Sequence, residues 1–151
     1  MVRTLVMLLC LSIPACWGSP KYETQRGIGV YCETDQECPT REALELVVGF
    51  CLTEIATRFG CAIPTTILGR LRVFFSPDPV GVTPPGYAGL IRGTVIRLHW
   101  QGSVCTSALY HELLHLVVQL QRGAIDAGHE LREYWDTEGE VIRVCQEQIA
   151  L

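Results

Sequence analysis

The segment His-Glu-Leu-Leu-His at residues 111–115 combines side chains that can bind a metal ion and move a proton. On a helix, residues four apart lie on one face, so His111 and His115 can direct two imidazoles at one ion. Zinc accepts imidazole nitrogen in a tetrahedral shell. Glu112 is placed to accept a proton from a water that the metal acidifies. This spacing matches a known pattern of metal-dependent hydrolytic sites, and it predicts a hydrolytic zinc site.

A catalytic zinc ion needs a third protein ligand and one open position. We predict that His129 is this ligand, because it follows the motif helix in the segment GAIDAGHE, where the chain can turn back over the histidine face. Asp126 is close enough in sequence to hold the tautomer of that imidazole. Four glutamates remain alternatives for the third ligand, namely Glu130, Glu133, Glu138 and Glu140.

Aromatic residues and a further histidine complete the candidate site. Tyr134, or alternatively Tyr87, can donate a hydrogen bond to the oxyanion that forms during hydrolysis. Trp135 is expected to be a packing residue that anchors the loop carrying His129. His99 lies in an expected strand, and we interpret it as structural.

Amphipathic spacing predicts three helices, over residues 41–59, 106–121 and 137–149. Thr40 can cap the start of the first helix, and Gly60 and Gly123 can end the first and second. Thr137 and Glu140 have the spacing of a capping box at the start of the third. The second helix carries the histidine motif, and the other two are expected to be scaffold.

Alternating apolar residues predict two strands, over residues 71–75 and 89–99. The second is interpreted as one strand with a single buried face and a bulge at Gly93. A short loop leads from it into the motif helix. Residues 123–136 form an irregular segment after that helix. Together these elements predict an α+β fold.

The N-terminus predicts export. Residues 1–18 have a basic start and an apolar run that is too short to span a bilayer, which is typical of a signal peptide. Ile-Pro-Ala-Cys resembles a bacterial lipobox that would acylate Cys16, and cleavage before Ser19 is the alternative. Residues 19–31 are expected to be a tether, and residues 32–151 a single domain.

Eight cysteines support an oxidising compartment. Processing removes Cys10 from the fold and removes or acylates Cys16. Six remain: Cys32, Cys38, Cys51, Cys61, Cys105 and Cys145. They allow up to three disulfides, of which Cys32–Cys38 is the most local, although some can instead be buried free thiols. Disulfides would offset the small core of so short a domain.

The charge pattern excludes two classes of partner. In 151 residues the formal net charge is −4, the charged fraction is 19%, and Lys21 is the only lysine. We therefore expect no nucleic acid, and membrane contact only through an N-terminal lipid. The predicted protein is a monomer in the bacterial periplasm, on the outer membrane as a lipoprotein, or secreted.

The HELLH segment resembles the active-site helix of zincin metallopeptidases, and the resemblance covers about residues 88–136. It implies that His111 and His115 bind zinc and that Glu112 is the general base. It also implies that the strand before the helix borders the cleft and pairs with extended substrate. Zincin-like architecture would give a short, twisted, mostly antiparallel sheet packed on this helix, with scaffold helices and disulfides.

Subfamily patterns bear on the third ligand. The metzincin extension has glycine and histidine where this chain has Val118 and Gln121, so the chain departs from it. A thermolysin-like arrangement implies a glutamate from the following helix, which Glu138 and Glu140 leave open. A histidine shortly after the helix is similar to SprT-type ligand spacing. Those proteins are intracellular and work near DNA, so only their ligand geometry is carried over.

The predicted function is hydrolysis of peptide bonds in a peptide or protein substrate, with one catalytic zinc ion. The alternative is a non-catalytic exported lipoprotein that keeps zinc for structure or binds a partner. A fourth protein ligand would indicate a structural site, and an open position a catalytic one.

Overall fold

The computed structural model describes residues 18–36, 38–77, 89–99, 103, 105 and 107–149. The expected signal peptide up to residue 17, with Cys16, lies outside these residues, and so does Tyr87. None of the helices in the described ranges is both long and apolar enough to cross a membrane.

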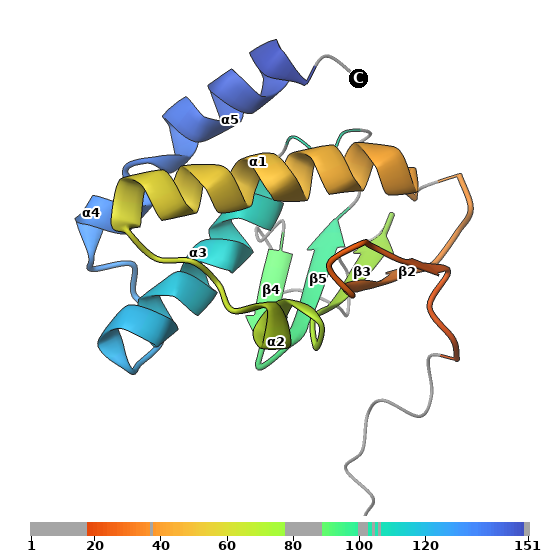
Figure 1. Ribbon diagram of the computed structural model, residues 1–151, viewed down its shortest axis with the longest axis horizontal. Coiled ribbons are helices and arrows are strands. Elements are labelled where there is room, and N and C mark those ends of the chain that lie inside the picture. The colour runs from red at the N-terminus through yellow and green to blue at the C-terminus, as the bar shows by residue number, and fades with distance from the viewer. Residues whose placement is uncertain are drawn as a thin grey trace, which may run out of the picture.

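The described residues form an α+β fold with one five-stranded sheet (Figure 1). The strands are β1 (Tyr22–Glu23), β2 (Gly29–Cys32), β3 (Arg72–Ser76), β4 (Gly89–Arg92) and β5 (Val95–His99). The helices are α1 (Arg41–Phe59), α2 (Thr65–Leu68), α3 (Ser107–Arg122), α4 (Arg132–Trp135) and α5 (Glu138–Gln148). The α+β prediction is confirmed at this level.

The sheet is mixed, so the expectation of a mostly antiparallel sheet is wrong. Its order is β1-β2-β3-β5-β4, with parallel pairs β2·β3 and β3·β5 inside and antiparallel pairs at both edges. The reason lies in the connections. Helix α1 is the crossover between β2 and β3, and a crossover returns the chain to the sheet in the same direction.

Residues 89–99 form a hairpin rather than one bulged strand. Arg92 pairs with Val95, and Gly93 between them has φ +60°. Glycine adopts this left-handed conformation without steric cost, which suits the first central residue of a two-residue hairpin turn. The register pairs Ile91 with Ile96, so odd positions of β4 share a face with even positions of β5. The apparent alternation along residues 89–99 was therefore not that of one strand, and the prediction was wrong. The hairpin makes β4 an edge strand beside α3.

The segment expected to be a tether belongs to the sheet. Residues 22–23 and 29–32 are β1 and β2, and Val30 in β2 is fully buried between its neighbours. Strands of two and four residues are too short to show alternation in the sequence. The folded domain therefore begins before residue 32.

Helix α1 follows its prediction and supplies one wall of the core. The Thr40 hydroxyl accepts the Ala43 N–H at 3.2 Å, and Gly60 ends the helix at φ +60°. The buried face of α1 consists of Leu44, Val47, Val48, Cys51 and Ile55. These residues join one apolar cluster with the inward residues of the sheet and the buried side chains of α3 and α5.

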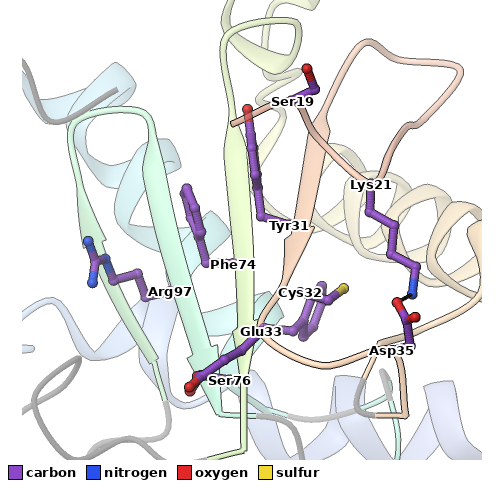
Figure 2. Close-up of a pocket in the computed structure, with 10 residues that line it drawn as sticks. Ser19, Lys21, Tyr31, Cys32, Glu33, Asp35, Phe74, Ser76 and Arg97 are labelled. Carbon is purple, nitrogen blue, oxygen red and sulfur yellow. Dashed lines mark hydrogen bonds and ion pairs between the residues drawn. The ribbon is translucent and has the colours of Figure 1, made fainter. Parts of the chain in front are cut away.

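The other face of the sheet carries a different row of side chains (Figure 2). Tyr31 in β2 stacks on Phe74 in β3 with ring centroids 4.5 Å apart, and the Arg97 guanidinium of β5 lies 5.8 Å from the Phe74 ring centroid. Strand residues alternate between faces, so this row points away from the apolar cluster. The row lines a hollow that also includes Lys21 and Asp35, which form an ion pair at 2.6 Å.

Two disulfides staple the fold. They join Cys32 to Cys38 and Cys105 to Cys145. The local pair is as predicted, and the second ties the segment before α3 to α5. Among the cysteines that the structure describes, the buried Cys51 and the half-buried Cys61 are free thiols. The two disulfides fit an extracellular protein.

The start of α5 has no capping box. Thr137 has helical backbone angles, and its hydroxyl donates to the Tyr134 carbonyl at 2.6 Å. The Glu140 carboxylate pairs with Arg58 at 3.0 Å. Helix α4, which the sequence did not reveal, ends just before α5, so the chain enters α5 already in a helical conformation.

Candidate metal centre

Helix α3 places the two motif histidines one turn apart. It spans residues 107–122, close to its prediction, and Gly123 ends it at φ +76° with its N–H donating to the Gln119 carbonyl. His115 is buried at 9% exposure, and Glu112 at 3%. The motif therefore faces the interior of the molecule rather than solvent.

The three predicted ligands converge. His111 Nε2 lies 3.2 Å from His115 Nε2, which lies 3.4 Å from His129 Nε2. All three ligand atoms are within 4.8 Å of one another, so this group can hold a metal ion. Zinc–nitrogen bonds of about 2.0–2.1 Å at tetrahedral angles put ligand nitrogens about 3.3 Å apart. The His111–His115 and His115–His129 separations match this value.

His129 reaches the cluster from the loop after α3. Among the described residues, His129 is the one non-glycine residue that has a positive φ, at +54°. Backbone strain of this kind persists where the surroundings impose it, often at functional sites. Three hydrogen bonds hold this conformation. The His129 N–H donates to the Asp126 carbonyl at 3.2 Å. The Asp126 carboxylate accepts from the N–H groups of Glu130 and Leu131.

Asp126 does not have the predicted role. Instead of holding the His129 imidazole, its carboxylate accepts from two backbone N–H groups and from the Trp135 indole N–H at 2.7 Å. In a tight loop, an aspartate carboxylate forms hydrogen bonds with nearby backbone N–H groups in preference to more distant side chains. Asp126 thus fixes the loop that carries His129 and positions Trp135 beside it.

Glu138 orients the first ligand. Its Oε1 lies 2.7 Å from His111 Nδ1, so Nδ1–H donates to the carboxylate and Nε2 is left to bind a metal. Metal-binding histidines usually have such a partner on the second ring nitrogen. Two other candidate ligands are engaged elsewhere, Glu133 with Arg122 and Glu140 with Arg58.

The protonation of the two motif histidines differs. Burial alone lowers the pKa of His111, but the hydrogen bond and charge of Glu138, with the charge of Glu112, raise it above its ordinary value. Burial, with the neighbouring His111 and His129, lowers the pKa of His115 to about 4. His115 is therefore neutral at pH 7, as a metal ligand must be.

Glu112 sits between α3 and the edge strand β4. It accepts a hydrogen bond from the Ile91 N–H, and a Cβ on Gly89 would lie 2.8 Å from its Oε1. Glycine at position 89 thus leaves room for the carboxylate. Burial raises the pKa of Glu112 to about 7, against the opposing effects of His111 and the Ile91 N–H. A carboxylate with a pKa near 7 suits general-base catalysis.

The remaining candidates lie elsewhere or have other contacts. The Tyr134 hydroxyl donates to Gln121 at 2.6 Å, and its ring stacks on Phe59, so the predicted oxyanion role is not supported. His99 pairs with Ser76 in the sheet. Trp135 anchors the loop as predicted, but its ring also lies against the histidines. That contact has no signal in the sequence.

Comparison of the chain with protein-family models, with curated proteins and with solved structures gives no match.

Proposed function

We propose that this protein is an exported zinc-dependent peptidase of the HExxH type. One observation carries the proposal: three histidines bring their ring nitrogens within 4.8 Å of one another, and the residue directly after the first of them is a buried carboxylate. The three histidines offer neutral nitrogen donors, which suit zinc better than calcium or magnesium. The two disulfides support the exported location.

Each residue of the site has a distinct task in this reaction. A zinc ion held by the three histidines would supply a Lewis acid that polarises the scissile carbonyl and acidifies water. Glu138 keeps the His111 ring oriented for binding. Glu112 accepts the proton of the attacking water at its carboxylate and returns it to the leaving amine.

The edge strand β4 supports a peptide as the substrate. It pairs with β5 on one side and adjoins Glu112 on the other, through the Ile91 N–H. An extended peptide that added to this edge would lie next to the general base. Backbone pairing would then set its orientation without requiring a particular side-chain pocket.

The first test is the zinc content of the oxidised mature domain, with hydrolysis of mixed peptides measured alongside. We expect about one zinc ion per wild-type chain, loss of zinc in His129→Ala, and retention in Glu112→Gln with hydrolysis lost. His99→Ala is the matched control, because it removes a histidine of the sheet. Wild type without zinc would refute the site. Zinc without hydrolysis would favour the non-catalytic alternative.

A further inference from the structure

The indole of Trp135 contacts all three candidate ligands at once. Its centroid lies 5.0 Å from the His111 ring, 4.8 Å from the His115 ring and 4.4 Å from the His129 ring. The three imidazole centroids are themselves 4.8–5.2 Å apart. The four rings therefore stand at the corners of a nearly regular tetrahedron, with the indole over one side of the histidine triangle.

His115 shows why this contact matters. Its Nδ1 is buried and has no hydrogen-bond partner among the described residues, whereas His111 Nδ1 donates to Glu138. Metal-binding imidazoles usually depend on such a hydrogen bond for their orientation. For His115 the packing of the ring against Trp135 takes its place. The indole is itself fixed, because it is 9% exposed and its N–H donates to Asp126 at 2.7 Å.

We propose that Trp135 is a positioning residue, whose indole holds the three imidazoles in their converging arrangement and limits the number of ligands that a bound metal ion can take. This inference rests on the proposed metal site. The indole packs on one side of the three imidazole rings, with its centroid 4.4–5.0 Å from theirs, and fills the space on that side. A metal ion held by these histidines would therefore be closed to additional water ligands on the side that Trp135 covers.

The test uses Co²⁺ as the probe, because four-coordinate Co²⁺ absorbs visible light far more strongly than five- or six-coordinate Co²⁺. We compare wild type, Trp135→Ala and Tyr134→Ala. Tyr134 is the matched control, since it is an equally buried aromatic residue of α4 whose ring contacts Phe59. We expect strong absorption in wild type and Tyr134→Ala. In Trp135→Ala we expect weak absorption and affinity lower by about 10- to 100-fold, as for loss of a ligand-orienting contact.

Unchanged absorption and affinity in Trp135→Ala would overturn the proposal and leave Trp135 as a packing residue. If that variant does not fold, Trp135→Phe decides: it keeps a smaller ring without the Asp126 bond, and we expect affinity several-fold below Tyr134→Phe. Equal affinities of these two variants would also overturn the proposal. Wild type that binds neither Co²⁺ nor Zn²⁺ would instead refute the metal site itself.

Discussion

Glu138 offers the sharpest test of how the surroundings would support the proposed metal site. Its carboxylate accepts from His111 Nδ1 at 2.7 Å, and both side chains are mostly shielded, at 24% and 21% exposure. A charge-assisted hydrogen bond in such surroundings contributes about 2 kcal/mol. Replacing Glu138 with alanine should therefore weaken zinc binding by about 30-fold, within the range for partners of metal-binding histidines.

The assay is competition for zinc against a chromophoric chelator at pH 7.5. Glu140→Ala is the control, because Glu140 lies in the same first turn of α5 but pairs with Arg58. Glu138→Gln should lose only a few-fold, since an amide oxygen still accepts from Nδ1–H. Equal affinity of Glu138→Ala and Glu140→Ala would refute the reasoning. Loss of stoichiometric zinc in Glu138→Ala would make Glu138 a ligand rather than an orienting group.

Three further predictions concern stability and thiol chemistry. In metal-free protein, His129→Gly should exceed His129→Ala in stability by about 1 kcal/mol in urea unfolding, because alanine must hold φ near +54°; equal stabilities would contradict the strain. Replacing Cys105 and Cys145 with serine should cost about 4 kcal/mol by the same measurement, since their disulfide closes a loop with a sequence separation of 40; a cost below about 1 kcal/mol would show that the chain-entropy argument fails. Native protein should be alkylated at Cys61 but not at Cys51, because burial of Cys51 raises its pKa to about 12. Mass spectrometry of the labelled peptides measures this, and labelling of Cys51 before unfolding would contradict the prediction.

The sequence predicted the features of the site that depend on residues close together in the chain. The apolar period of α3 and the four-residue spacing of His111 and His115 are properties of one helix. His129 lies only 14 residues beyond His115, on a loop with little freedom to go elsewhere. The bounds of α1 were predicted equally well, because a capping threonine and a terminal glycine mark both ends.

The sequence did not predict contacts between segments that lie far apart in the chain. Glu138 meets His111 across 27 residues and from another helix, and nothing in its neighbourhood distinguishes it from Glu140. Asp126 was assigned to an imidazole because backbone donors of its own loop are not visible in a sequence. The mixed sheet was missed because β2 is short and its partner β3 lies beyond α1. Parallel pairing of that kind depends on the crossover, which residue types do not encode locally.

If β4 binds a peptide as proposed, its length of four residues would limit how much of that peptide its outward edge can contact. In an antiparallel pair, alternate residues turn their backbone groups outward. The Ile91 N–H faces Glu112 and not β5, so Gly89 and Ile91 are the outward residues of this four-residue strand. A bound peptide could pair with the backbone of only these two residues. The Ile91 N–H already donates to Glu112. Such a short edge favours weak contacts that depend little on the sequence of the peptide. It also offers few backbone groups for edge-to-edge pairing between copies of the chain.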